Sequence, residues 1–128
     1  MRSGLSSYYR DCFAQGIGGF MEYIGSFAYD RVLLKGDIRL IIYGNGIMGK
    51  RLYALLENND MLDKLECICD AKPELWGKMY RNVLIISPEE AISQKRECHF
   101  LTAGKYAEEQ VRILQKGGVR NIHMFLEL

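Results

Sequence analysis

The sequence lacks an excess of charge of either sign. Seventeen lysines and arginines stand against sixteen aspartates and glutamates, which leaves a formal net charge of +1. A protein that binds along a nucleic acid needs a basic excess to neutralise phosphates. The charge balance therefore predicts that this chain has no nucleic-acid partner.

The sequence also lacks paired cysteines. Its four cysteines form no C-x-x-C motif, and His99 and His123 add none of the usual metal-ligand spacings, so no metal site is predicted. Cys67 and Cys69 alternate within an apolar run, which puts both on one face of a strand. We expect them to fill the core as reduced thiols, as is usual in a cytoplasmic protein.

No segment is apolar and long enough to cross a bilayer. The aromatic-rich stretch 13–29 contains Gln15, Glu22 and several glycines, whereas a membrane helix needs about 20 predominantly apolar residues. No small-residue cleavage site follows a basic start, so a signal peptide is not predicted either.

Catalytic motifs are missing as well. A short-chain dehydrogenase or epimerase needs a tyrosine with a lysine four residues later, and none of the eight tyrosines has one. No serine has a histidine partner at the spacing of a hydrolase motif. Lys105 and Tyr106 follow the expected fourth strand, where they either touch a substrate or form a solvated turn and a packing ring. The catalytic residues are therefore unknown, and enzyme activity is left open.

What the sequence does contain is an alternation of apolar strands and amphipathic helices. The continuous apolar run Ile38–Tyr43 is typical of a strand buried on both faces of a parallel sheet. Further strands are expected at 65–69, 82–86, 99–103 and 121–125, and helices at 50–57, from 87 onward and at 106–116. The pattern predicts an α/β fold, a Rossmann-like three-layer sandwich with a five-stranded, mainly parallel sheet in the order 3-2-1-4-5.

Two connections carry clear local signals. Ser87, Pro88 and Glu90 are the N-cap, first residue and capping-box partner of a helix start. By contrast, Ala71–Tyr80 holds a proline, a glycine and no helical period, so it is expected to be a loop.

A glycine motif directly follows the first expected strand. Residues 44–49 read G-x-G-x-x-G, in which the first glycine permits a tight turn, the second lets the backbone approach a pyrophosphate and the third brings the helix close to the strand. The helix amides would then face the anion. Asp70 ends the second strand, 21 residues after Gly49, where a carboxylate accepts hydrogen bonds from ribose hydroxyls. Alternatively, the glycines serve only the turn and Asp70 is a solvated strand end.

Two parts of the chain are distinguished: residues 1–36, an amino-terminal helical appendage, and residues 37–128, the Rossmann-like domain. Apolar residues recur at steps of three and four across Tyr9–Phe27, which is a helical stripe. The predicted topology leaves the sheet face under the first helix short of a second helix. We expect the stripe to cover that face, in its own or a partner subunit. A homo-oligomer such as a dimer, or association with a separate catalytic chain, is therefore predicted.

Three segments resemble a known group of proteins: "IRLIIYGNGIMGKRLYALL", "VLIISPEEAI" and "FLTAGKYAEEQVRILQKGGVRNIHMF", together with Asp70. They are similar to small Rossmann-like nucleotide-binding domains of bacterial polysaccharide-synthesis proteins. Examples are the amino-terminal domains of sugar O-acyltransferases and the nucleoside-diphosphate-sugar epimerase/dehydratases. The resemblance covers about Asp37 to Leu128 and does not extend to residues 1–36.

The resemblance implies NAD(H) or a UDP-sugar as ligand, within a nucleotide-sugar or polysaccharide modification system. It implies phosphate contacts from the glycine loop and ribose or base contacts after the second strand. It also implies that residues at the end of the fourth strand border the ligand crevice between the first and fourth strands. The implied residues are Gly44, Asn45, Gly46, Ile47, Met48 and Gly49 for the phosphates, Asp70 and Ala71 for the ribose or base, and Thr102, Ala103 and Gly104 for the border.

Two functional hypotheses follow. The first is a nucleotide-binding module, in which Asp70 favours NAD over NADP because a carboxylate repels a 2′-phosphate, although Lys72 nearby weakens that preference. The second is a protein-interaction or regulatory domain that keeps the Rossmann frame with an empty nucleotide crevice. The first predicts measurable nucleotide affinity, and the second predicts none.

Overall fold

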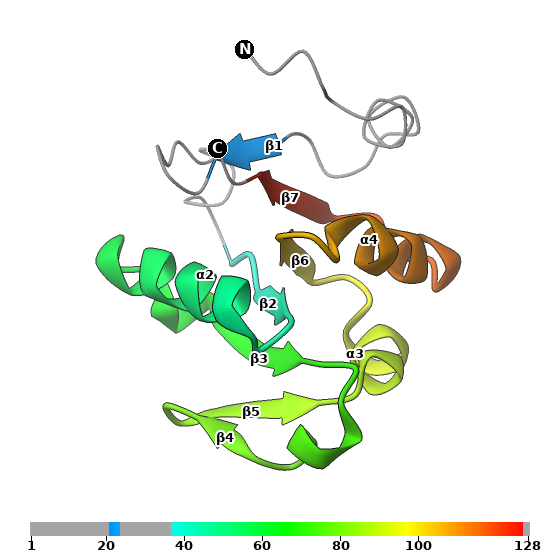
Figure 1. Ribbon diagram of the computed structural model, residues 1–128, viewed down its shortest axis with the longest axis horizontal. Helices are drawn as coiled ribbons and strands as arrows, with labels where there is room; N and C mark the ends of the chain where they lie inside the picture. The colour runs from blue at the N-terminus through cyan, green and yellow to red at the C-terminus, as the bar shows by residue number, and fades with distance from the viewer. Residues whose placement is uncertain (1–20, 24–36, 127–128) are drawn as a thin grey trace.

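The computed structural model describes residues 21–23 and 37–126 of the 128-residue chain. The strands are β1 (Met21–Tyr23), β2 (Leu40–Tyr43), β3 (Leu65–Cys69), β4 (Met79–Tyr80), β5 (Val83–Ile86), β6 (His99–Ala103) and β7 (Ile122–Leu126). The helices are α2 (Ile47–Asn58), α3 (Pro88–Lys95) and α4 (Ala107–Lys116), with short 3₁₀ turns η2 (Leu62–Lys64) and η3 (Pro73–Leu75). Strands and helices alternate (Figure 1), as the α/β prediction requires.

The strands form one sheet in the order β1-β7-β6-β2-β3-β5-β4. All neighbouring strands are parallel except β4 and β5, which are antiparallel. The five predicted strands keep their predicted neighbours inside this sheet, but the strand number and the full order differ from the prediction. The two extra strands lie at the edges and have only three and two residues, too few to produce a readable apolar pattern.

The segment Ala71–Tyr80 is not the plain loop that was predicted, because it contains η3 and β4. Met79 pairs with Leu84, and Tyr80 pairs with Val83. The two residues between these pairs, Arg81 and Asn82, have φ values of 48° and 71°, as a two-residue hairpin turn of type I′ requires. Arg-Asn is not the usual sequence signal for that turn, so the hairpin escaped the sequence analysis.

The predicted amino-terminal helix is wrong at the residues described there. Met21–Tyr23 is a strand parallel to β7, with Met21 opposite Met124 and Tyr23 opposite Leu126. Backbone groups on the edge of β7 need partners, and an extended segment provides them where a helix cannot. The remainder of residues 1–36 lies outside the described residues, and with it the predicted role in packing or oligomerisation.

The core has two layers, one on each face of the sheet. Side chains of β2 alternate between them: Leu40 and Ile42 pack with α2, whereas Ile41 and Tyr43 pack with α3 and α4. All four are buried, which confirms a strand enclosed on both faces. Figure 1 shows α2 on one side of the sheet and α3 and α4 on the other, the arrangement that right-handed crossovers produce.

The three described cysteines are free and buried in the core. Cys67 and Cys69 share one face of β3, as predicted, and that face is the α3/α4 side of the sheet. Burial raises the pKa of the Cys67 thiol to about 12. Burial also raises the pKa of Cys69 and Cys98. Thiols with raised pKa values stay protonated and unreactive at neutral pH.

Residues 21–23 and 37–126 were considered for a metal site and for a membrane-spanning helix, and neither is present among them. They contain no group of three or more histidine, cysteine, aspartate or glutamate side chains placed to hold a metal ion. None of their helices has both the length and the apolar character of a membrane span.

Candidate functional site

The predicted site residues gather where the central strands end. We call this end of the sheet the carboxyl edge, and the opposite end the amino edge. β2 lies between β3 and β6, so the residues that directly follow these three strands, Gly44, Asp70 and Gly104, are brought close together. The chain leaves β2 for α2 on one face and β6 for α4 on the other, and ligands of open α/β sheets bind at such a switch point.

The three glycines of the glycine turn have different structural roles. Gly44 has a φ of +109° and its amide donates a hydrogen bond to the Cys69 carbonyl oxygen at 2.6 Å, so the turn itself requires glycine. A β-carbon on Gly49 would overlap the carbonyl group of Gly44, whereas one on Gly46 would meet nothing within 4 Å. The fold therefore needs the first and third glycines, while the second leaves open space beside the helix.

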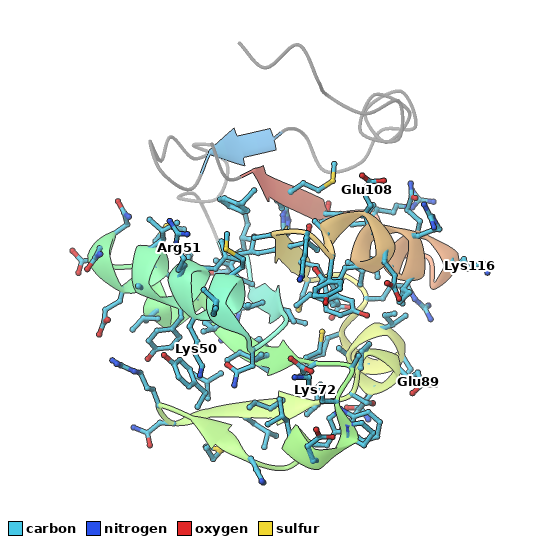
Figure 2. All side chains as sticks on the ribbon, in the orientation of Figure 1. Lys50, Arg51, Lys72, Glu89, Glu108 and Lys116 are labelled. Atoms are coloured by element: carbon cyan, nitrogen blue, oxygen red, sulfur yellow. The ribbon has the colours of Figure 1, made fainter. Side chains whose placement is uncertain are left out.

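Three helices begin at the carboxyl edge. They differ in whether a side chain caps the free backbone amides of the first turn and in whether that turn carries acidic residues. The Ser87 hydroxyl accepts the Glu90 amide of α3 at 3.0 Å, which confirms the predicted cap. The first turn of α3 carries two glutamates, and so does that of α4. The first turn of α2 has neither a capping side chain nor an acidic residue, and Lys50 and Arg51 follow it (Figure 2).

This difference leaves the amino end of α2 ready for an anion. The first amides of a helix have no intrahelical acceptor, and those of Ile47, Met48 and Gly49 have no other acceptor among the described residues. The helix dipole adds positive potential at the same place. A phosphate could accept these hydrogen bonds.

Asp70 faces the glycine turn, as predicted. It is 8% exposed, and its Oδ2 accepts a hydrogen bond from the Asn45 amide at 2.7 Å. Its Oδ1 accepts one from the Lys72 amide at 2.9 Å. Asp70 is therefore no solvated strand end. Because each carboxylate oxygen can accept a second hydrogen bond, the fixed carboxylate retains capacity for a hydroxyl donor.

The segment after Asp70 contributes a residue that sequence reasoning missed. The indole Nε1 of Trp76 donates to the Asp70 carbonyl oxygen at 2.6 Å, and the side chain is 39% exposed. Ala71 and Lys72 are exposed beside it. The only tryptophan in the chain therefore lies next to the candidate ribose-binding carboxylate, although its position in an expected loop gave no sign of this.

The predicted border at the end of β6 is only partly at the surface. Thr102 is fully buried and its hydroxyl donates to the His123 carbonyl oxygen at 3.3 Å, so its side chain is used within the sheet. Ala103 is also buried. Gly104 does reach the site, because the Cγ of Met48 lies 2.6 Å from where a β-carbon on Gly104 would stand. The turns after β2 and β6 are thus in direct contact.

Two large side chains are exposed on either side of these turns. Ile47, the first residue of α2, is 79% exposed, and Tyr106, before α4, is 61% exposed. The Lys105 ammonium lies 5.2 Å from the centre of the Tyr106 ring. Ile47 and Tyr106 therefore add exposed apolar surface beside the turns that follow β2 and β6.

A second residue missed by sequence reasoning is Gln110 of α4. Its Nε2 lies 3.3 Å from where a β-carbon on Gly44 would stand, and its Oε1 is buried without a hydrogen-bond partner among the described residues. Ala107, Val111 and Leu114 form the buried face of α4, and position 110 falls on that face. A polar residue at an inward helical position was the signal available in the sequence.

The histidines take no part in this site. Each lies in a strand, as predicted, and Nδ1 of His99 is 2.9 Å from Nε2 of His123. Both residues lie toward the amino edge, since His99 begins β6 and His123 is the second residue of β7.

Comparisons with known proteins identify the fold but no family. No protein-family model matches the sequence, and no curated protein matches it. Among solved structures, the chain is similar to RSP, a Rex-family repressor, with 22% identity, a TM-score of 0.54 and 74% of this chain covered. RSP in complex with beta-NADH is 21% identical, with a TM-score of 0.50 and 70% of this chain covered. RSP in complex with beta-NAD+ and operator DNA is 20% identical, with a TM-score of 0.54 and 94% of this chain covered. The chain spans about half the length of these structures, 47%, 45% and 61% respectively.

These similarities correct two expectations. The exclusion of nucleic acid as a partner is wrong, because a similar structure is that of a repressor bound to operator DNA. Net charge is a sum over the chain and says nothing about where basic residues gather, so a value near zero excludes no such partner. The resemblance to polysaccharide-synthesis proteins is also unsupported, since the shared G-x-G-x-x-G turn is common to many Rossmann-like folds.

Proposed function

We propose that this domain binds NAD(H) at the carboxyl edge, with the pyrophosphate on the first turn of α2 and a ribose at Asp70. The observation that carries the proposal is the uncapped first turn of α2 beside the open space at Gly46. The RSP structures with beta-NADH and beta-NAD+ support the choice of ligand. Ile47 and Tyr106 offer apolar surface for the nicotinamide half.

Asp70 favours NAD(H) over NADP(H). Its carboxylate is held by two backbone amides, so it cannot turn away from a 2′-phosphate without losing both hydrogen bonds. A ribose hydroxyl can instead donate to either oxygen. A UDP-sugar also carries a ribose and a pyrophosphate, but no comparison favours it, and it serves as a competitor ligand in the test below.

The test uses Trp76 as an internal probe. Trp76 is the only tryptophan, and its indole is hydrogen-bonded to the Asp70 carbonyl oxygen. NADH bound at Asp70 should therefore quench the Trp76 emission by energy transfer. NADH should therefore lower tryptophan fluorescence in a saturable way, and NAD⁺ should compete. NADP⁺ and a UDP-sugar should compete more weakly. Binding of the UDP-sugar in preference to NADH would contradict the choice of ligand.

A matched pair of variants tests the site. Gly46→Val places a side chain in space that is empty in the fold, so its melting temperature should stay near that of the wild type while NADH affinity falls at least tenfold. Ala54→Val adds similar bulk to the exposed side of α2 and should leave affinity unchanged. If the wild type binds no NAD(H), the domain is instead a protein-interaction or regulatory module with an empty crevice.

A second candidate function is a regulatory module that responds to the redox state of the nicotinamide. It is favoured by the similarity to RSP with beta-NAD+ and operator DNA, which covers 94% of this chain. This candidate predicts at least a tenfold difference between the affinities for NADH and NAD⁺. It also predicts that genomic DNA fragments bind differently in the presence of the two forms. Equal affinities for NADH and NAD⁺, together with no binding of genomic DNA fragments, would contradict this second candidate function.

A further inference from the structure

Trp76 is anchored to the residue whose carboxylate holds a ribose under the proposed function. Its indole Nε1 donates a hydrogen bond to the Asp70 carbonyl oxygen at 2.6 Å, and its backbone amide donates one to the Pro73 carbonyl oxygen at 3.1 Å. The amide of the next residue, Gly77, donates to the Ile85 carbonyl oxygen of β5 at 2.8 Å. The side chain and the backbone of Trp76 are therefore both held in place in the ligand-free fold.

The anchored indole is left partly exposed. Its nitrogen is its only hydrogen-bonding group, so the remainder of the ring is apolar surface. Trp76 is 39% exposed, and within the described part of the chain neither another aromatic ring nor a cation lies against its ring. Tyr53 and Tyr80, by contrast, contact each other with ring centres 5.2 Å apart. A fixed, exposed ring offers a surface on which a flat ligand group can stack with little loss of side-chain freedom.

The hydrogen bonds of Asp70 indicate the direction in which a bound nucleotide runs. Its Oδ2 accepts from the Asn45 amide of the glycine turn at 2.7 Å, whereas its Oδ1 accepts from the Lys72 amide at 2.9 Å. The carboxylate therefore lies between the glycine turn and the segment that leads to Trp76. In a nucleotide the ribose likewise lies between the phosphate and the base. With the phosphates on α2, a ribose at Asp70 directs its base away from the glycine turn, toward Trp76.

We propose that Trp76 is a further ligand-contacting residue, on whose exposed ring the base of the bound nucleotide stacks. The proposal rests on the proposed NAD(H) site and makes that base the adenine, with the nicotinamide half toward Ile47 and Tyr106. Stacking uses the flat face that every base has, so it strengthens binding without reading the pattern of donors and acceptors on the base. Asp70 then selects the sugar, and Trp76 holds the base.

The experiment separates the ring of Trp76 from its hydrogen bond. Trp76→Leu removes both, whereas Trp76→Phe removes the hydrogen bond and keeps a ring. Calorimetric titration with ADP-ribose should show about tenfold weaker binding for Trp76→Leu, within the range of base–aromatic stacking, while Trp76→Phe stays within about threefold of the wild type. Leu84→Ala shortens another exposed apolar side chain, on β5, and should leave the affinity for ADP-ribose unchanged.

The emission of Trp76 provides an independent readout of contact. ADP-ribose does not carry the dihydronicotinamide ring to which tryptophan transfers energy, so it lowers the emission only where its adenine stacks on the indole. Saturable quenching of the wild-type emission by ADP-ribose is therefore expected.

Each part of the experiment has a result that would overturn the proposal. Equal losses of affinity in Trp76→Phe and Trp76→Leu would show that the hydrogen bond matters and the ring does not. Unchanged affinity in Trp76→Leu, or bound ADP-ribose without quenching, would show that the base lies elsewhere. In these cases NADH binding by the wild type would leave the proposed function intact. A wild type that binds neither NADH nor ADP-ribose would refute the proposed function itself, and this proposal with it.

Discussion

The two ends of the sheet differ in whether their polar groups have hydrogen-bond partners. At the amino edge, Glu66 accepts from Arg39 Nε at 3.0 Å and from Lys95 Nζ at 2.9 Å, and His99 contacts His123 at 2.9 Å. At the carboxyl edge, the first turn of α2 has no cap and Gln110 Oε1 has no partner within the described structure.

This contrast shows which end of the domain folding alone explains. Unpaired polar groups reduce stability, so a fold selected only for stability would satisfy them at both ends. The amino edge meets that condition, while the carboxyl edge keeps uncapped amides at the start of α2 and one unpaired buried acceptor, Gln110 Oε1. Under the proposed function, the carboxyl edge is the end that binds the ligand.

The largest effect is expected for Gly49→Ala. The added β-carbon overlaps the Gly44 carbonyl group, so either the turn or the helix must shift. Such overpacking against a backbone should lower the free energy of unfolding by about 3 kcal/mol, measured by urea denaturation. Gly46→Ala, with empty space around it, is the control and should change stability little. Equal effects would show that the glycines do not have separate roles.

An intermediate effect is expected for Asp70→Asn. One oxygen becomes an NH₂ group that faces a backbone amide, so one of the hydrogen bonds to Asn45 and Lys72 is lost. Leaving a buried amide unpaired should lower the free energy of unfolding by about 1–3 kcal/mol. NADH affinity should fall as well, as followed by Trp76 emission. Asp63→Asn, on the exposed η2 turn, should change neither quantity.

The smallest effect is expected for Glu66→Gln at the amino edge. Hydrogen bonds from Lys95 and then Arg39 hold the pKa of Glu66 below the ordinary value of 4.5. The ion pairs therefore stabilise the fold at neutral pH, and their contribution is lost as pH falls through that lowered pKa. Because the side chains are 30–46% exposed, the variant should lose less than about 1 kcal/mol.

The same Glu66→Gln comparison should be followed by thermal melts from neutral to acidic pH. The difference between wild type and variant should shrink below pH 4.5, and NADH affinity at neutral pH should not change. A variant that weakened NADH binding would mean that the amino edge is not purely structural.

Sequence patterns predicted the parts of this molecule that depend on neighbouring residues. The apolar run of β2, the Ser87 cap and the glycine turn after β2 each follow from short-range chemistry and were expected. The helix after the turn begins at Ile47, three residues earlier than expected, so the turn itself is shorter. β1 was not foreseen, because three residues become a strand only when β7 offers them an edge.

The residues around the site show the same limit. Gln110 and Trp76 acquire their positions through contacts with Gly44 and Asp70, which are distant along the chain. The resemblance placed Thr102 at the site, but its hydroxyl donates a hydrogen bond across to β7. Local patterns do not say on which side of a sheet a side chain finds its partner.

The backbone contact between Gly44 and Gly49 has a consequence for the speed of recognition. Gly49 packs directly against the Gly44 carbonyl group, and the Gly44 amide is hydrogen-bonded to Cys69, so the turn is held in place in the ligand-free fold. Little conformational entropy is then lost on association. We expect arrival at the site to be limited by encounter rather than by rearrangement, with differences between ligands expressed in how long each one stays.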